Sequence, residues 1–185
     1  MTRFIRIIRA MFIGLFLGLF IQTCLVAIGQ VSGHSMMPTL KDQEYVLLSK
    51  VSHVLHMAPD YGDIVVIDSR IDRKHTIMDE IKAPLVEIHR RITGQEKDLN
   101  IWIKRVIGKS GDVLEFKNGH VYRNGQMLNE PYISEEMKYT IPVPYTIPEN
   151  TVFVMGDNRN HSVDSRYIGP VPIDHVLGIV IFKSE

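Results

Sequence analysis

The pattern of hydrophobic and polar positions divides the chain into an apolar amino-terminal stretch and a longer mixed region. Ala10–Ile28 contains only Gln22 and Thr23 as clearly polar side chains, and no charged residue occurs between Ala10 and Leu40. Helical residues rise about 1.5 Å each, so this stretch matches roughly the thickness of a bilayer's hydrocarbon core. The pattern therefore predicts one transmembrane helix over residues 10–28.

Basic residues ahead of the apolar stretch indicate its orientation. Arg3, Arg6 and Arg9 are the only charged residues among the first 30. The positive-inside rule then places residues 1–9 in the cytoplasm and residues 29–185 on the outer face of the cell membrane. The alternative is a cleaved secretory signal peptide, which also has a basic start and an apolar centre. Its apolar centre is usually about 7–15 residues long, which favours a retained single-pass anchor.

Beyond the anchor, short apolar or alternating runs bounded by turn residues predict a mostly-β domain. The Asn-Gly pairs at 118–119 and 124–125 are typical of tight hairpin turns and predict a meander over 112–128. The stretch Ile141–Pro148 holds three prolines, so we expect a semi-rigid surface connection and not a central strand. The predicted strands are Tyr45–Lys50, Asp63–Asp68, Ile101–Ile107, Val113–Phe116, His120–Tyr122, Thr151–Met155 and Gly178–Phe182.

Residues 70–98 differ from the rest of the outer region in their charge density. They carry 7 basic and 6 acidic side chains in 29 positions. Apolar residues recur there at helix-like spacing, although Pro84 interrupts them. These apolar residues are Ile77, Ile81, Leu85 and Ile88. The pattern predicts an exposed, partly helical insertion.

Composition narrows the classes of function. The 185 residues are 45% hydrophobic, which suits one domain with a packed core. Residues 31–185 hold 18 basic and 21 acidic side chains, and this mildly acidic balance argues against a nucleic-acid partner. The single cysteine, Cys24, excludes an intramolecular disulfide. The eight histidines form no HExxH pair, and no cysteine cluster or glycine-rich phosphate loop is present, so the residues give only a weak indication of a metal site.

A candidate nucleophile follows the anchor directly, in the segment Gly33–Leu40. Ser35 lies here, and Pro38 restrains the chain just after it. A serine hydroxyl becomes a good nucleophile only when a neighbouring base removes its proton. Taken alone, the segment favours a polar juxtamembrane linker over a catalytic role.

A candidate base lies in the predicted strand Ile101–Ile107. Alternation along a strand places Trp102, Lys104 and Val106 on one face, so Lys104 has apolar neighbours. Desolvation lowers the pKa of an ammonium group, and a neutral amine can act as a general base. The alternative is an exposed lysine that protects an edge strand from aggregation.

The third candidate segment, Gly156–Arg166, is polar, charged or glycine at ten of its eleven positions. Asp157 and Asp164 can pair with Arg159 and Arg166 in the same segment, and bidentate pairs would make a rigid loop that supports a site. His161 lies within this loop and is the rival to Lys104, as the base of a serine–histidine–aspartate arrangement. His34 fits that role less well, because it is adjacent to Ser35 along the chain.

Together and in this order, the segments resemble the bacterial type I signal peptidase family. The motifs are SMMPTL from Ser35, YGDIVV from Tyr61, IWIKRVIGKSGD from Ile101 and GDNRNHSVDSRYIGPV from Gly156. The likeness covers the anchor and most of the outer region, and it fails mainly in 70–98 and 129–148. It implies a β-rich catalytic domain without metal or cofactor, in a membrane-bound serine endopeptidase that removes signal peptides from secreted preproteins.

The resemblance also implies roles for individual residues. Ser35 would be the nucleophile, with its backbone N–H in the oxyanion hole, Lys104 the general base, and Ser162 the group that holds the lysine amine. Gly33 departs from the family, which often has a hydroxyl residue there as a second oxyanion donor. The loop expected to support the site contributes Asp157, Arg159, Asp164 and Arg166. The positions expected near the substrate groove are Met36, Pro38, Trp102 and Ile103.

The resemblance implies two partners, secreted preproteins and the lipid bilayer, whereas the sequence sets no oligomeric state. One alternative is an anchored β module that binds extended peptides without turnover. A second is a self-cleaving repressor with a related serine/lysine domain, which needs a DNA-binding amino terminus in place of the apolar stretch. Mitochondrial and plastid processing peptidases share similar motifs, so the sequence favours a bacterial source only through Asp157-Asn158-Arg159.

Overall fold

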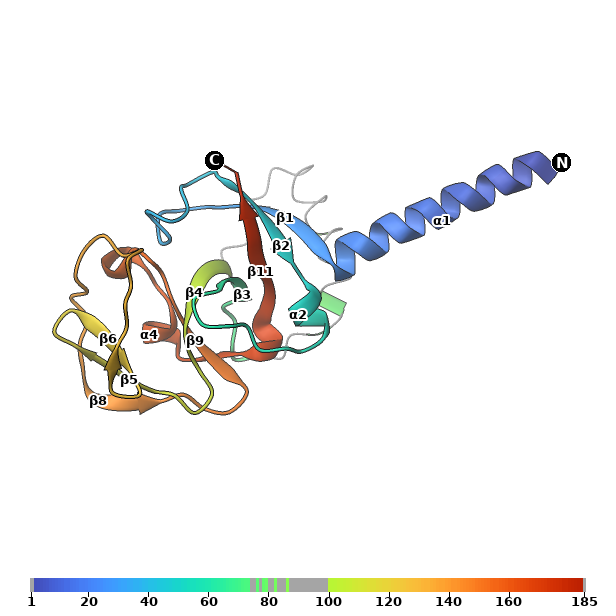
Figure 1. Ribbon diagram of the computed structural model, residues 1–185. Coiled ribbons are helices and arrows are strands. Elements are labelled where there is room, and N and C mark those ends of the chain that lie inside the picture. Colours follow the sequence, from blue (N-terminus) through green and yellow to red (C-terminus); the bar gives the residue numbers. More distant parts are fainter. Residues whose placement is uncertain are drawn as a thin grey trace.

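A long amino-terminal helix projects from a β-rich body in the computed structural model of the chain (Figure 1). The structure describes residues 2–73, 76, 78–79, 82, 86 and 100–184. Helix α1 spans Thr2–Cys24, and strand β1 follows at Val26–Gln30. Among these described residues, no helix has the combined length and apolar character needed to cross a bilayer.

The end of the predicted anchor differs from the structure. The sequence predicts one helix through Ile28, whereas the helix ends at Cys24. The next residues form β1, which pairs antiparallel with β2 (Tyr45–Ser49), and Ile28 lies opposite Leu47. Pairing with β2 satisfies the backbone groups of β1, so the chain leaves the helix before its apolar run is complete. An apolar run alone does not distinguish a helical end from a strand.

The larger sheet has seven antiparallel strands in the order β1-β2-β11-β3-β4-β9-β10. Strand β4 lies between β3 and β9 in this sheet. The three neighbouring strands come from segments that are far apart in sequence. Valine and isoleucine side chains of β3, β4 and β9 form a buried cluster within this sheet. The remaining strands are β3 Ile64–Asp68, β4 Ile101–Lys109, β9 Thr151–Met155, β10 Val171–Pro172 and β11 Val176–Lys183.

The smaller sheet confirms the predicted meander. Its strand order is β7-β6-β5-β8, and both predicted Asn-Gly pairs form the turns between neighbouring strands. All four turn residues have positive φ, between 53° and 79°, which asparagine and glycine tolerate best. The strands are β5 Val113–Lys117, β6 His120–Arg123, β7 Gln126–Met127 and β8 Ile141–Thr146.

The proline-rich segment is a strand, so its prediction as a surface connection is wrong. Residues 141–146 form β8 and pair with β5, where Thr146 lies opposite Val113. The exclusion of a central strand is confirmed, because β8 is the last strand of its sheet. Proline lacks an N–H to donate, and an edge strand needs hydrogen bonds on one side only.

A shared core holds the smaller sheet against β4 and β9. Phe116 of β5 meets Phe153 of β9 at a ring-centroid distance of 5.6 Å, and Ile107 of β4 belongs to the same buried cluster. Gly108 allows this close packing, since a Cβ there would collide with Ile147. Strands β4 and β9 are therefore packed on both faces.

Besides α1, four short helical turns with defined bounds lie between the strands. They are α2 at Val51–Val54, a 3₁₀ turn at Arg159–His161, α4 at Ser165–Ile168 and a 3₁₀ turn at Ile173–His175. The charged insertion lies largely outside the described residues, including the four apolar residues that suggested a helix. At its start, Arg70 and Arg73 both pair with buried Asp68, at 2.7 and 3.2 Å.

Candidate active site

Ser35 and Lys104 lie in direct contact although 69 residues separate them. Ser35 is in the turn between β1 and β2, and Lys104 is in the middle of β4. The Lys104 Nζ donates to Ser35 Oγ at 2.8 Å and to the Ile103 carbonyl at 3.0 Å. The structure therefore places the expected nucleophile and base within hydrogen-bonding distance.

Lys104 is buried, which excludes its interpretation as an exposed edge-strand lysine. The residue is 4% exposed, and its Nζ lies 5.6 Å from the centre of the Trp102 ring. Burial lowers the pKa of Lys104 to about 8, and the nearby carboxylates of Asp164 and Asp157 limit that fall. Because neutral amine forms more readily at this pKa, the side chain is suited to accept a proton near physiological pH.

The Ser35 turn is held by the loop that follows β9. Asn158 donates from its backbone N–H to the Ser35 carbonyl at 3.0 Å and from its side chain to the His34 carbonyl at 3.1 Å. The Thr39 hydroxyl donates to Asp157 at 2.5 Å. These bonds join residues more than 100 positions apart and fix the backbone on which Ser35 is carried.

Asp164 organises the second half of this loop. Its carboxylate accepts from the Ser162 hydroxyl at 2.8 Å, from the Gly156 N–H at 2.9 Å and from two Arg166 nitrogens, both at 2.8 Å. Both charged residues are nearly inaccessible, so the bidentate pair is stronger than a surface ion pair. The expected Asp164–Arg166 pair is thus present.

The other two charged residues of the loop take partners outside it. Asp157 accepts from Arg105 Nε and Nη2 at 2.8 and 2.6 Å. Arg159 donates to both carboxylate oxygens of Glu130, at 2.8 and 2.5 Å. Asp157 and Arg159 meet only through a backbone bond of 3.0 Å, in the tight turn where β9 ends. Arg105 lies within the IWIKRVIGKSGD motif, but the resemblance implied no role for it at the site. Glu130 lies outside all of the motifs, so the motifs did not indicate it.

Ser162 lies beside the Ser35 turn, but its hydroxyl is directed to Asp164. Among the described residues, the structure gives the Lys104 amine no hydrogen bond from Ser162. The expected role of Ser162 in holding the lysine stays a prediction. Its proximity is still clear at Gly156, where an added Cβ would collide with both Ser162 Oγ and the Ser35 carbonyl oxygen.

The four residues expected near the substrate groove differ in exposure. Pro38 is exposed, and Trp102 and Ile103 are half-buried beside Lys104. Met36 is only 1% exposed and packs with Val31, Leu40 and Val46 in a core cluster. This placement indicates a packing role for Met36, whereas the other three are at least partly accessible to solvent.

Neither histidine candidate forms a side-chain hydrogen bond with Ser35 among the described residues. The His161 side chain is 70% exposed, and its Nδ1 lies 3.1 Å from Asn158 Oδ1 and 3.8 Å from Glu135 Oε1. His34 is exposed as well. Among the residues that the structure describes, there is no group of three or more His, Cys, Asp or Glu side chains that could bind a metal ion.

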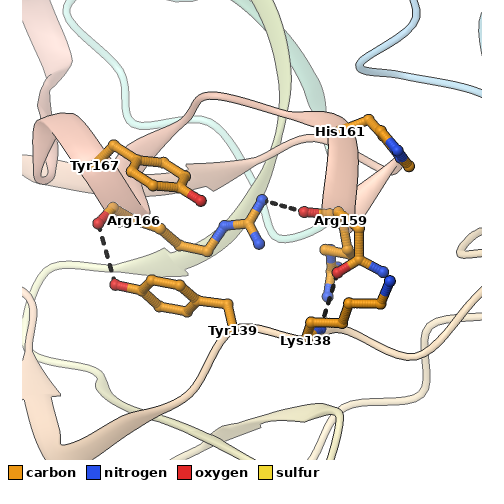
Figure 2. Close-up of a pocket in the computed structure, with 7 residues that line it drawn as sticks. Lys138, Tyr139, Arg159, His161, Arg166 and Tyr167 are labelled. Carbon is orange, nitrogen blue, oxygen red and sulfur yellow. Dashed lines mark hydrogen bonds between the residues drawn. The ribbon is translucent and has the colours of Figure 1, made fainter.

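A pocket of about 340 Å³ lies between the 138–139 segment and the residues from Arg159 to Tyr167 (Figure 2). Arg166 and the two tyrosine rings at 139 and 167 lie close together there, and the rings are 6.0 Å apart. The lining residues are Lys138, Tyr139, Arg159, Asn160, His161, Arg166 and Tyr167.

Comparison with known proteins identifies the family. The family described as "Signal peptidase, peptidase S26" matches residues 4–184, almost the whole chain. The chain belongs to this signal peptidase family. Membership makes it a serine peptidase and confirms the resemblance seen in its motifs.

Curated S26 signal peptidases align along most of the chain. Probable signal peptidase I-1 of Synechocystis is 36% identical over 153 residues, covering 83% of this chain and 68% of that protein. Signal peptidase I of Bacillus licheniformis is 33% identical over 168 residues, covering 86% and 76%. Thylakoidal processing peptidase 1 of Arabidopsis thaliana is 29% identical and covers 95% of this chain, which spans 46% of that longer protein.

A solved S26 structure is also similar. The crystal structure of a signal peptidase I from Enterococcus faecalis V583 is 27% identical, with a TM-score of 0.45. The match covers 66% of this chain and 97% of that one.

The close approach at Gly156 leads to a prediction for this signal peptidase. In Gly156→Ala, the new Cβ would lie 2.5 Å from the Ser35 carbonyl oxygen, which is backbone and must move. A displacement near 1 Å at a reacting group costs roughly 10²-fold, so we expect kcat to fall by about that factor. Cleavage of a signal-peptide substrate measures the effect. Gly29→Ala is the control, since its Cβ would meet only ordinary contacts at 3.5 Å or more, and equal activity of the two variants would contradict the prediction.

Proposed function

We propose that this chain is a membrane-bound signal peptidase I that cleaves secreted preproteins with a Ser35–Lys104 dyad. The observation that carries the proposal is the 2.8 Å hydrogen bond between Lys104 Nζ and Ser35 Oγ, formed by a buried lysine. A serine whose hydroxyl meets an amine of lowered pKa has the two groups needed for acyl transfer. Family membership supplies the reaction class, and this contact supports the assignment of residues to it.

The proposed reaction begins with neutral Lys104. Its Nζ takes the Ser35 proton as Oγ attacks the carbonyl carbon of the scissile peptide bond. The resulting oxyanion is stabilised by the Ser35 backbone N–H. Protonated Lys104 then gives its proton to the leaving amine, which becomes the amino terminus of the mature protein. The signal peptide remains as an ester on Ser35 until water, activated by Lys104, releases it.

The supporting loop keeps the reacting groups in register. Asn158 holds the Ser35 carbonyl, and Asp164 fixes Gly156 and Ser162 against the same turn. Catalytic groups that are already oriented lose less entropy on reaching the transition state. In this proposal, the loop charges act by positioning and do not exchange protons with the substrate.

The proposed membrane attachment rests on the amino-terminal segment. Residues 10–28 are apolar and three arginines precede them. The large apolar side chains of α1 from Phe4 to Leu17 are exposed, except Ile8, which is half-buried. An exposed apolar helix of this kind is suited to lipid. With its amino terminus in the cytoplasm, α1 would place the β-rich body on the outer face, where signal peptides emerge from the bilayer.

The pH dependence of cleavage tests the identity of the base. Only neutral Lys104 can accept the Ser35 proton, and its neutral fraction rises with pH until the pKa of about 8 is passed. We therefore expect kcat/KM to increase about tenfold per pH unit below this value and to level off above it. The measurement is the initial rate of cleavage, between pH 6 and 10, of a synthetic peptide spanning a signal-peptide cleavage site with small residues before the cleaved bond.

A histidine base would give a different profile, with its limb near pH 6.5. His161→Ala provides the matched variant. Its exposed ring contacts Asn158 and Glu135, so we expect near wild-type kcat and an unchanged profile. A large loss of kcat in His161→Ala, together with a limb near 6.5 in the wild type, would contradict the lysine base.

A further inference from the structure

The segment between residues 130 and 139 runs along the supporting loop and bonds to it at several points. Asn160 receives the Lys138 N–H at 2.8 Å and donates to the Glu136 carbonyl at 2.9 Å. Tyr139 Oη donates to the Arg166 carbonyl at 3.1 Å, a contact seen in Figure 2. This segment lies within the region where the motif resemblance to the signal peptidases fails.

Glu130 forms a buried ion pair with the supporting loop. Its carboxylate receives two nitrogens of Arg159, and the two side chains are 3% and 1% exposed. Arg159 in turn donates from Nε to the Gly156 carbonyl at 3.2 Å, and its own carbonyl accepts from Arg166 at 2.7 Å. Glu130 is thereby connected to the backbone that lies against Ser35.

Tyr132 connects the same carboxylate to the strand that carries Lys104. Its Oη donates to Glu130 Oε1 at 2.8 Å, and its ring lies 4.0 Å from the Arg105 guanidinium carbon. Arg105 follows Lys104 in β4 and holds Asp157 with two nitrogens. Burial and the Glu130 carboxylate raise the pKa of Tyr132, so its hydroxyl stays protonated as a donor at physiological pH.

We infer that Glu130 and Tyr132 are positioning residues of the peptidase, which together set the distance between Ser35 Oγ and Lys104 Nζ. Two lines of contact start at the Glu130 carboxylate, and one reaches the Ser35 side while the other reaches the Lys104 side. Neither residue touches the dyad itself. This inference rests on the proposed Ser35–Lys104 dyad.

The physical consequence of losing Glu130 is specific. Arg159 would keep its charge in a buried position without a carboxylate, and such a charge draws in water or moves outward. Movement of Arg159 would release the Gly156 carbonyl and loosen the backbone beside Ser35. Water entering near the dyad would also hydrate Lys104, which raises the pKa of its amine toward the ordinary value.

The test compares Glu130→Gln and Tyr132→Phe with the wild type, as full-length protein in detergent micelles acting on the peptide substrate. We expect kcat to fall roughly 10- to 100-fold for Glu130→Gln, with KM changed little, because the reacting groups are misplaced and not the substrate. We also expect the midpoint of the pH profile to move upward. Tyr132→Phe keeps the ring on Arg105 and removes only the hydroxyl bond, so we expect a smaller change in the same direction.

Two control variants remove a carboxylate and a tyrosine hydroxyl for which, among the described residues, the structure gives no side-chain hydrogen bond. Glu149→Gln changes an exposed residue, and Tyr145→Phe removes the hydroxyl of a half-buried tyrosine whose ring packs near Phe153. Both should keep wild-type kcat and pH profile. Thermal unfolding followed by circular dichroism gives the folded fraction of every variant, so that rates are compared per folded molecule.

A lower rate per folded molecule with a shifted midpoint supports the inference. Wild-type rates per folded molecule in both Glu130→Gln and Tyr132→Phe, or lower rates with an unmoved pH midpoint, would overturn it. If Glu130→Gln does not fold, the midpoint and kcat of Tyr132→Phe decide the outcome. Lys104→Ala in the same assay separates the two proposals, because its full activity removes the dyad, whereas its inactivity beside unchanged Glu130 and Tyr132 variants removes only the positioning role.

Discussion

Replacing Ser35 with alanine is expected to lower kcat by at least about 10⁴-fold and to leave KM nearly unchanged. The Ser35 Oγ is the oxygen that Lys104 contacts, and alanine offers no atom to form the ester. The neighbouring backbone bonds, from Asn158 to the Ser35 and His34 carbonyls, do not involve the hydroxyl and should persist. The turn should therefore keep its shape while losing its nucleophile.

Cleavage of the peptide substrate and of a purified preprotein measures this effect, with mass spectrometry to identify the new amino terminus. Ser32→Ala is the control, since Ser32 is exposed three residues earlier in the same turn region. Cleavage by Ser35→Ala at the wild-type site and rate would show that another group is the nucleophile. Rapid acid quench of the wild type should in addition trap the signal-peptide ester on Ser35.

Replacing Lys104 with alanine is expected to lower kcat by at least about 10³-fold across the pH range. Alanine removes the amine that receives the Ser35 proton. The hydrogen bond from Lys104 Nζ to Ser35 Oγ is lost with it. The variant should still fold, because it removes a charge that burial disfavours and shortens a side chain in a sheet held by β3 and β9.

The wild type is expected to lose activity below pH 8 as Lys104 becomes protonated, and the residual activity of Lys104→Ala should lack this dependence. Lys109→Ala is the matched control, because Lys109 ends the same strand and pairs with exposed Asp60 at 3.1 Å. Its kcat and pH profile should match those of the wild type. Persistence of the pH 8 limb in Lys104→Ala would assign that titration to a different group.

Much of the β-rich body follows from local sequence patterns. Each predicted strand of the outer region is present, with ends that differ by no more than two residues, because alternation and turn residues are local signals. The two Asn-Gly turns are the strongest example, since asparagine and glycine tolerate the positive φ values that such turns require. The short strands β7 and β10 escaped prediction because two residues carry no readable period.

The charge pairs of the loop were only partly predictable. Two aspartates and two arginines within Asp157–Arg166 balance each other, so the sequence contains no sign that one pair is broken. In the fold, Arg105 of β4 pairs with Asp157, and Arg159 pairs with Glu130 instead. Such exchanges depend on which strands become neighbours, and local patterns do not determine that arrangement.

The junction between α1 and β1 has a mechanical consequence. Lys50 donates to the Leu25 carbonyl at 2.8 Å, and Val26 lies opposite Ser49, so the sheet begins directly at the foot of the helix. With α1 as an anchor, no loose tether separates lipid from the catalytic body. In that case the five residues of β1, at about 3.3 Å each, would span about 17 Å between the foot of the helix and the turn that carries Ser35. Ser35 would then work at a fixed height above the bilayer and select the position of the cleaved bond by its depth.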